Sequence, residues 1–294
     1  MFSVIIPTFG RPKHLKRAVE SVLNQSIEEF ELLIVDDNGD TSNHQAETMN
    51  VALSFKTDKL RLICHKTNSN GSVARNTGLK KVRYSYVLFL DDDDEFRQHL
   101  LRDLKFSLSQ YRHSIIYWMS DIFINAKPVK TSSYTTTGRI VKDVLTLKTD
   151  FNTSCFCFKV SALRSINGFN ESLVRHQDID VIARINAKFP ISHLNEVHTI
   201  RHVDSTQNQP QFEKFLANKG LFYQSVMDSE SITSAEIEAM KRAHSAHLVI
   251  YALKKMKILY VICNLGSLIR SIDVLVSLVK RAVVFMKKKC WEIL

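Results

Sequence analysis

The chain has 294 residues, of which 45% are hydrophobic and 24% charged, with only 8 glycines and 5 prolines. This composition is typical of a globular protein with a sizeable core, and it excludes long disordered linkers. The formal net charge of +10 raises the question of nucleic-acid binding. From Lys241 onward, however, 11 Lys and Arg residues face only two acidic residues, a balance of +9. Because the first 240 residues are therefore close to neutral, we expect no nucleic acid among the partners.

Cysteine usage and hydropathy set the expected compartment. The five cysteines form no CxxC pair, so a reducing cytoplasm is the simpler setting. The apolar run near the N-terminus, residues 2–9, has no basic region before it and predicts a strand rather than a signal peptide. The longest uncharged apolar stretch, residues 258–269, has 12 residues, whereas a spanning helix needs about 18. We therefore expect no transmembrane segment.

The first third of the chain alternates strand and helix signals. Apolar, β-branched runs predict strands, and apolar residues spaced three and four apart predict helices. In chain order we expect a strand at 2–9, a helix at 12–26, a strand at 30–38, a helix at 44–56, a strand at 60–66, a helix at 71–82 and a strand at 84–94. Strands separated by helices indicate right-handed βαβ units and a parallel sheet, buried on both faces.

The remainder of the chain gives a less regular pattern. We expect a helix at 97–112, a strand at 114–124, a polar loop at 127–138, a strand at 155–160, helices at 161–166 and 177–189, and closing strands within 191–203. From about residue 211 onward the pattern is helical. Residues 258–285 predict one long amphipathic helix, or two that are broken near Gly266.

Acidic residues follow two of the predicted parallel strands. Asp36 and Asp37 end the second strand, and Asp91 to Asp94 end the fourth. In open parallel sheets, ligands bind beyond the carboxyl ends of the strands, so both sets should face one crevice. Massed carboxylates repel one another, and Mg²⁺ or Mn²⁺ among them would relieve that repulsion while bridging to substrate phosphates. The alternative for the acidic run is a solvated acidic turn.

A polar loop that enters a helix, residues 68–78, offers a second candidate contact with phosphate. The chain contains neither a P-loop nor a Rossmann dinucleotide fingerprint. Backbone N–H groups at such a helix start can hold phosphate, with Arg75 as a charge partner. The alternative is that Arg75 forms an ordinary surface ion pair.

Five segments, in this order and spacing, resemble family 2 glycosyltransferases, which are inverting enzymes with a GT-A fold. These segments are residues 4–26, 31–42, 71–79, 87–96 and 168–185. The resemblance covers roughly residues 2 to 205 and implies an α/β GT-A fold, with a Rossmann-like, mostly parallel central sheet flanked by helices. It further implies a catalytic domain at 1–205, with a nucleotide-sugar half at about 1–95 and an acceptor half at about 96–205. Residues 206–294 would then form a helical C-terminal region that includes the cationic amphipathic helix.

The resemblance also implies roles for residues on the donor side. The nucleotide base would be bordered by Pro7, Thr8, Phe9 and Arg11. Asp36 would bind the base, with Asp37 beside it. In the family's D-x-D motif, Asp93 would hold the metal, while Asp91 or Asp92 would contact the ribose or the ion; Asp94 matches a further acidic position.

On the acceptor side, the resemblance places the general base at Asp178. This chain has Gln177 where the family frequently has Glu, and Asp180 could partly replace that carboxylate. Independently of the family, Asp178 can be explained as an acidic residue in the first turn of a helix, opposing the macrodipole. His202 matches a histidine often found near the diphosphate and is a candidate metal ligand, although a strand histidine is usually structural.

The function that the resemblance implies is a glycosyltransferase dependent on Mn²⁺ or Mg²⁺. It would move a sugar from a nucleoside-diphosphate sugar, with a UDP-sugar as the expected donor, to a glycan or lipid-linked acceptor in O-antigen, capsule or LPS biosynthesis. The cationic C-terminal helix suits an anionic membrane surface, so we expect a cytoplasmic protein that is peripheral on the inner face of the cell membrane. That helix can instead pack on the catalytic domain or form an oligomer interface. The alternative functions are a two-metal phosphotransferase or nuclease and a noncatalytic nucleotide-sugar-binding protein.

Overall fold

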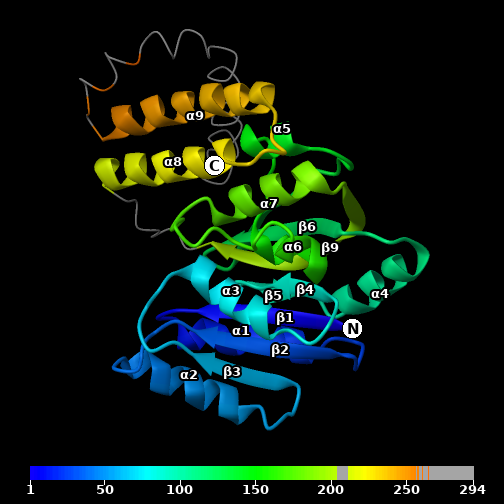
Figure 1. Cartoon of the computed structure of the whole chain (residues 1–294). Coiled ribbons are helices and arrows are strands. Elements are labelled where there is room, and N and C mark those ends of the chain that lie inside the picture. Colours follow the sequence, from blue (N-terminus) through cyan, green and yellow to red (C-terminus); the bar gives the residue numbers. More distant parts are fainter. Residues whose placement is uncertain (204–210, 256, 258–259, 261–263, 265–294) are drawn as a thin grey trace, which may run out of the picture. The chain divides into compact units, whose positions relative to one another are not determined.

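The computed structural model describes residues 1–203, 211–255, 257, 260 and 264, which Figure 1 labels by element. The chain divides into two compact units. The first comprises residues 1–141 and 149–208, and the second comprises residues 142–148 and 209–294. The cationic helix expected at 258–285 lies outside the described residues, apart from Tyr260 and Asn264.

The first unit is built on a nine-stranded sheet. Its strands are β1 (Phe2–Thr8), β2 (Phe30–Asp36), β3 (Leu60–Cys64), β4 (Tyr86–Phe89), β5 (Glu95–Phe96), β6 (Ile115–Ile124), β7 (Lys127–Thr131), β8 (Phe156–Lys159) and β9 (Ile191–Val203). Their order is β3-β2-β1-β4-β8-β6-β9-β5, with β7 paired to β6. The predicted strands of the first third are therefore present and adjacent.

Strand direction differs between the two halves of the sheet. β1 runs parallel to β2 and β4, and β2 runs parallel to β3, as the alternating pattern predicts. β8 is antiparallel to both β4 and β6, whereas β6 and β9 are parallel and β5 is antiparallel to β9. The expected mostly parallel sheet thus holds for the first half, and the second half is mixed. Because β8 is antiparallel to β4, β8 begins at the edge of the sheet where β4 ends. The turn that precedes β8 therefore lies at that edge.

Most helices of the two units lie in the predicted segments, whereas the short helix at residues 141–145 lies where no helix was expected. They are α1 (Pro12–Leu23), α2 (Asn43–Ser54), α3 (Gly71–Lys81), α4 (Leu100–Gln110), α5 (Val141–Leu145), α6 (Val160–Arg164), α7 (Gln177–Lys188), α8 (Phe212–Met227) and α9 (Ser234–Lys254), with a 3₁₀ turn at Thr153–Cys155. Within the described residues, no helix combines the length and the hydropathy that crossing a membrane requires.

One expected loop is partly a strand. Residues 127–138 were expected to be a polar loop, but β7 occupies 127–131 and pairs antiparallel with β6. Asn125 and Ala126 have φ values of 50° and 63°, which is the geometry of a two-residue hairpin turn. The strand is exposed along its whole length, so no apolar alternation marks it in the sequence. Residues 191–203, where more than one closing strand was expected, form the single strand β9.

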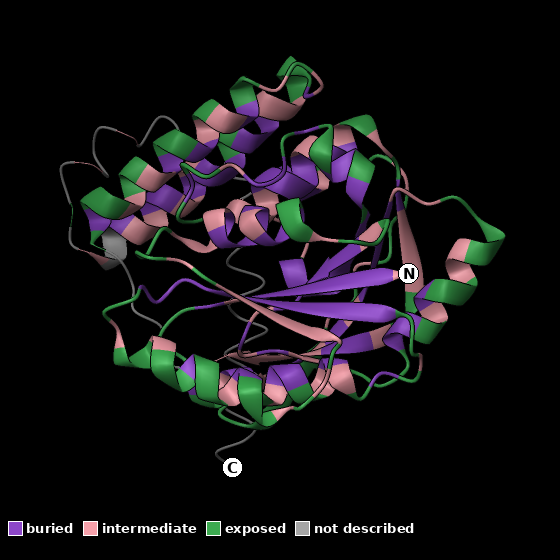
Figure 2. Cartoon of the chain, turned by 60° about the horizontal axis from the view of Figure 1, so that its bottom comes forward, coloured by how far each residue is buried: buried purple, intermediate pink, exposed green. Residues whose placement is uncertain are grey.

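Alternate residues of the parallel strands pack against helices on opposite faces of the sheet. On β1, Val4 and Ile6 belong to the same buried cluster as Leu15 of α1. Ile5 faces the other side and contacts α3 at Gly78, where an added Cβ would lie 2.7 Å from the Ile5 side chain. Figure 2 shows the central strands β1 and β2 as almost continuously buried. The core therefore fixes the carboxyl ends of β1, β2 and β4 at one edge.

In the second unit, a buried lysine joins α8 to α9. Lys219 is 2% exposed, and its Nζ lies 2.5 Å from Nδ1 of the fully buried His244. The Nε2 of His244 lies 2.9 Å from the carbonyl oxygen of Leu145. Because that carbonyl only accepts, Nε2 carries the imidazole proton and Nδ1 accepts from Lys219. Burial lowers the pKa of Lys219 to about 7.

This buried lysine predicts a pH-dependent stability. Its folded pKa is about 7 and its unfolded pKa is about 10.4, so between these values the unfolded chain binds more protons and the free energy of unfolding rises with pH. We expect this group to raise the free energy of unfolding of the wild type by up to about 4 kcal/mol between pH 7 and pH 10. In Lys219→Met, the free energy of unfolding, measured by urea unfolding followed through the helical signal, should lack this gain. Lys214→Met, at an exposed position of the same helix, should retain it; an identical pH slope in both variants would contradict the assignment.

Candidate functional site

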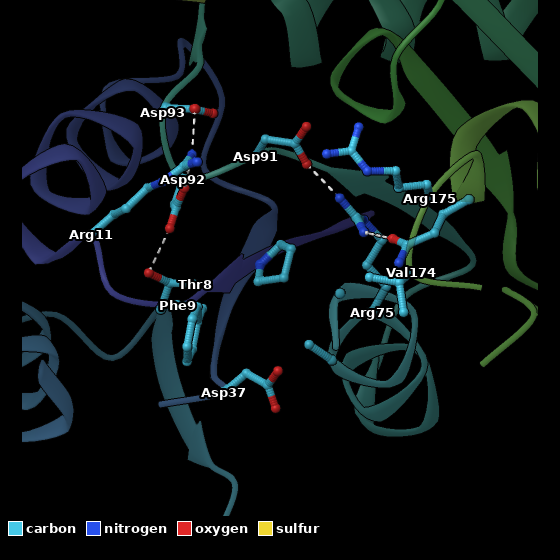
Figure 3. A pocket seen from close by; sticks show the side chains of 14 residues that line it. Thr8, Phe9, Arg11, Asp37, Arg75, Asp91, Asp92, Asp93, Val174 and Arg175 are labelled. Atoms are coloured by element: carbon cyan, nitrogen blue, oxygen red, sulfur yellow. Dashed lines mark hydrogen bonds and ion pairs between the residues drawn. The ribbon is translucent and has the colours of Figure 1, made fainter. Parts of the chain in front are cut away.

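A cavity of about 750 Å³ lies at the edge where β1, β2 and β4 end (Figure 3). The end of β1 supplies Pro7 and Thr8, and the loop after it supplies Phe9 and Arg11. Asp37 comes from the residue after β2, and Gly71, Ala74 and Arg75 come from the start of α3. The segment after β4 supplies Asp91, Asp92 and Asp93, and the segment entering α7 supplies Val174, Arg175 and Gln177. The cavity thus forms where parallel-sheet topology predicts a ligand site.

A smaller cavity of about 140 Å³ shares part of this wall. Asn152, Thr153, His176 and Asp178 line the smaller cavity only, whereas Arg75, Asp91, Val174, Arg175 and Gln177 line both. The candidate base therefore lies in a smaller cavity that adjoins the larger one and shares five lining residues with it.

Asp92 and Asp93 are held by residues of the loop that follows β1. Thr8 donates from Oγ1 to Asp92 Oδ2 at 2.8 Å, and Arg11 Nη1 lies 2.5 Å from Asp93 Oδ2 and 3.5 Å from Asp92 Oδ1. Burial raises the pKa of Asp92 to about 7 and also raises the pKa of Asp93. Figure 3 shows Arg11 beside both carboxylates, on the side of the cavity away from Arg75. A hydrogen bond and an ion pair therefore connect the end of β1 and its following loop to the segment after β4.

Asp91 is held from the other side by Arg75. Arg75 Nη2 donates to Asp91 Oδ1 at 2.6 Å, and the Arg75 guanidinium lies 5.5 Å from the centre of the Phe169 ring. Thr153 Oγ1 is 3.4 Å from the same carboxylate oxygen, and Ser154 Oγ accepts from the Asp91 backbone N–H at 3.1 Å. Arg75 is 9% exposed. The alternative interpretation, in which Arg75 forms an ordinary surface ion pair, is therefore wrong.

Asp94 differs from the three aspartates before it. It is 3% exposed and lines neither cavity. Its carboxylate accepts from Asn152 Nδ2 at 3.0 Å and from the His202 backbone N–H at 3.2 Å. Burial raises its pKa to about 7. The acidic run is thus neither a solvated turn nor a set of four equivalent ligands, because three members face the cavity and the fourth ties β9 to the site.

The two aspartates at the end of β2 also have different positions. Asp36, which was expected to bind the base, is fully buried, and its Oδ1 accepts from the backbone and side chain of Asn38. Asp37 lines the cavity instead. Its carboxylate accepts from the N–H groups of Ser69 and Asn70 at 2.9 Å each, and it also contacts the side chains of Asn68 and His65. The alternation of β2 turns Asp36 away from the cavity, and Asp37, itself only 3% exposed, is the one of the two that lines it.

Asp178 is the second residue of α7 and lies at the smaller cavity. Burial raises its pKa, an effect that the backbone N–H of Ile179 opposes. Gln177 accepts from Arg75 Nη1 at 2.8 Å. Asp180 is fully buried and ion-paired with Arg184 at 2.6 Å, and it lines neither cavity. It therefore does not replace the carboxylate that Gln177 lacks.

His202 lies apart from the aspartates that were expected to share a metal with it. Its Nε2 is 2.6 Å from Oε1 of Glu95, and it lines neither cavity. Among residues 1–203 and the described part of the second unit, no group of three or more His, Cys, Asp and Glu side chains is arranged to hold a metal ion. The donor chemistry of Asp91 and Asp93 nevertheless fits Mg²⁺ or Mn²⁺, because these ions commonly take one or two carboxylates and complete their coordination with phosphate and water.

Several residues at the site were not expected from the sequence. Asn152, Thr153 and Ser154 contact the acidic run from the turn that precedes β8. No local motif marks them, because only the antiparallel placement of β8 brings this turn to the site. Arg175 lines both cavities and was within the segment resembling the family, but its role could not be read from residue type alone.

Comparisons with known proteins point to one family. Residues 3–170 match the family model described as Glycosyl transferase family 2. A 104-residue stretch, 35% of this chain, is 43% identical to the poly(ribitol-phosphate) beta-N-acetylglucosaminyltransferase TarP of Staphylococcus aureus (strain N315) and covers 31% of it. The amylovoran biosynthesis glycosyltransferase AmsB of Erwinia amylovora is 27% identical over 191 residues, 62% of this chain and 63% of AmsB. The chain thus spans less than two thirds of the length of each of these relatives.

A solved structure has the same fold. The crystal structure of S. aureus TarS 1–349 in complex with UDP-GlcNAc matches with a TM-score of 0.67 and 18% sequence identity. The match covers 92% of this chain and 79% of that chain. This likeness bears out the predicted α/β GT-A fold.

The position of Asp37 predicts that it orders the loop at the start of α3. In Asp37→Asn, an amide N–H₂ group would replace one of the two oxygens that accept backbone N–H groups, so buried donors would lose their partner. We expect the free energy of unfolding to fall by about 2 to 3 kcal/mol and the amides of Ser69 and Asn70 to exchange hydrogen faster. Asp40→Asn changes an exposed position on the loop that follows β2. It should alter neither the free energy of unfolding nor the hydrogen exchange. Unaltered exchange at Ser69 and Asn70 in Asp37→Asn would show that other contacts order this loop.

Proposed function

Because the chain belongs to glycosyl transferase family 2, we propose that it transfers a sugar from a nucleoside-diphosphate sugar to a hydroxyl group of a glycan or lipid-linked acceptor, with inversion at the anomeric carbon. The observation that carries the proposal is the pair of adjoining cavities. The larger one offers an aromatic face and acidic and basic side chains, and the smaller one holds the half-buried carboxylate of Asp178.

The donor would lie in the larger cavity. Phe9 is 56% exposed, so its ring can stack on a nucleotide base, and Asp37 can accept from a base N–H group. We assign the base contact to Asp37 rather than to Asp36, because Asp36 is buried away from the cavity. Pro7 and Thr8 would border the base, and Asp92 the ribose. A UDP-sugar is the proposed donor, in line with the UDP-GlcNAc bound by the TarS neighbour.

A divalent cation, Mn²⁺ or Mg²⁺, would be held by Asp93 and Asp91. When bound, it would act as a Lewis acid that stabilises the negative charge of the departing diphosphate. We do not include His202 in this set, because it is paired with Glu95. Arg75, fixed at the shared wall by Asp91 and Gln177, would face the same diphosphate and stabilise its charge by hydrogen bonding.

Asp178 would act as the general base. Burial raises the pKa of this carboxyl group, which increases its affinity for a proton. In the proposed step, Asp178 takes the proton of an acceptor hydroxyl while the hydroxyl oxygen forms a bond to the anomeric carbon. The bond from that carbon to the diphosphate oxygen breaks, and both electrons leave with the nucleoside diphosphate. Attack from the side opposite the leaving group inverts the configuration.

The acceptor and the location are proposed by analogy with the relatives. TarP is named for poly(ribitol-phosphate), and AmsB for amylovoran biosynthesis. We therefore place this chain in the synthesis of a surface polysaccharide, in the cytoplasm at the inner face of the cell membrane. The 11 basic residues from Lys241 onward would contribute to attachment at anionic lipid, at about 1 kcal/mol for each basic residue near the surface.

Replacement of Asp178 tests the catalytic assignment. We expect Asp178→Asn to bind UDP as the wild type does but to release sugar from UDP-sugars at least about 100-fold more slowly, because a general base contributes about 10² to 10⁴ in rate. The measurement is isothermal titration with UDP and a UDP-release assay with a panel of UDP-sugars and candidate acceptors. Asp40→Asn should match the wild type in both. Wild-type protein that binds UDP without turnover would favour a noncatalytic binding protein, and metal-dependent cleavage of nucleic acid would favour a nuclease.

The metal assignment predicts a specific loss in Asp93→Asn. Mn²⁺ should tighten UDP binding by the wild type, because Asp93 would hold the ion and the ion would offset the negative charge of the diphosphate. In Asp93→Asn this gain should fall by about tenfold or more, while binding of uridine stays the same. Titrations with and without EDTA give both quantities. If Mn²⁺ and EDTA leave UDP binding by the wild type unchanged, the assignment of Asp91 and Asp93 as metal ligands is wrong.

A further inference from the structure

We propose that Gln177 is a positioning residue that holds the Arg75 guanidinium toward the donor diphosphate and, because its side chain is neutral, adds no second ion pair to the one that Arg75 forms with Asp91. This inference rests on the proposed function and adds to it a residue that determines affinity for the diphosphate. Gln177 and Arg75 both line the wall shared by the two cavities, so the pair lies where donor and acceptor would meet.

The contacts of Arg75 fix its guanidinium from three directions. Nη2 donates to Asp91 at 2.6 Å, Nη1 donates to Gln177 Oε1 at 2.8 Å, and the Phe169 ring lies 5.5 Å from the guanidinium carbon. The Gln177 amide is itself oriented, because its Nε2 donates to the carbonyl oxygen of Leu173 at 2.7 Å. With the amide nitrogen engaged there, only the oxygen faces Arg75. The amide therefore sets the direction of the guanidinium rather than merely contacting it.

Gly71, the first residue of α3, leaves the space that this pair occupies. A Cβ added at Gly71 would lie 2.9 Å from Arg75 Nη1 and 3.1 Å from Gln177 Oε1. The first of these distances is shorter than real Cβ contacts allow, so any side chain here would displace the pair. The backbone conformation of Gly71 has no positive φ that would by itself call for glycine. The close approach of Arg75 and Gln177 is thus the reason for glycine at this position.

The charge at position 177 matters because the larger cavity is already acidic. Its lining contains four aspartates and three arginines, a formal balance of −1. A glutamate at 177 would keep the size of the side chain and its contact with Arg75, but it would add a fifth carboxylate. That carboxylate would offset the attraction of Arg75 for an anion, and it would stand next to Asp178. A neutral amide keeps the hydrogen bond and leaves the charge of Arg75 available to the diphosphate.

The test compares UDP with uridine, because only UDP carries the phosphates that Arg75 would contact. We expect Gln177→Glu to weaken UDP binding by about tenfold, an effect of the size of one added charge at short range, and to leave uridine binding unchanged. Gly71→Ala should displace Arg75 and Gln177 without a change of charge. It should therefore also weaken the binding of UDP and leave the binding of uridine unchanged. Gln110→Glu, exposed at the end of α4, is the matched charge control and should bind both ligands as the wild type does.

The outcomes separate this inference from the function on which it rests. Isothermal titration is done on the full chain, with thermal unfolding to show that each variant is folded. If Gln177→Glu binds UDP like the wild type, or loses UDP and uridine equally, Gln177 has only a structural role and the inference is wrong while the proposed function stands. If the wild type binds neither UDP nor uridine, the proposed function fails and this inference fails with it.

Discussion

The repulsion among carboxylates at one edge of the sheet is the constraint on which the site depends. Asp37, Asp91, Asp92 and Asp93 line a single cavity, and Asp94 lies directly behind them. Each is held by donors from another segment: backbone N–H groups at the start of α3 hold Asp37, Arg75 holds Asp91, and Arg11 holds Asp93. Charge-assisted hydrogen bonds of this kind are about twice as strong as neutral ones, so the acidic cluster draws these segments together rather than forcing them apart.

These donors lie far from their acceptors in the sequence, so the topology of the sheet assembles the site. The loop after β1 reaches Asp92 and Asp93 because β1 and β4 are parallel neighbours that end at the same edge. The turn before β8 reaches Asp91 and Asp94 because β8 is antiparallel to β4 and begins at that edge. The parallel half therefore supplies Arg11 and Arg75 together with neutral donors such as Thr8, and the turn before β8 adds further neutral donors for Asp91 and Asp94.

The sequence predicted what local periodicity and strand direction determine. The strands of the first third, the helices other than α5 and the placement of Asp91 to Asp93 at a strand end all follow from apolar periodicity and from parallel pairing. It did not predict β7, because that strand is exposed and carries no apolar alternation. It assigned Asp36 to the base, although the pleat of β2 directs Asp36 inward and leaves Asp37 at the cavity. Asn152 could not be found, since its position depends on the register of a strand that lies far away in the chain.

The balance of charge explains why the position of each arginine matters more than the number of basic residues. The chain has a net charge of +10, yet its larger cavity has three arginines against four aspartates. Charges farther away than the screening length, about 8 to 10 Å in physiological salt, contribute little inside the cavity. Burial raises the pKa of Asp92 to about 7, so near neutral pH that carboxylate is partly protonated, and the cavity is less acidic than its residue count implies. An anionic ligand then depends on how the few arginines are oriented, which is the property that the neutral side chain of Gln177 controls.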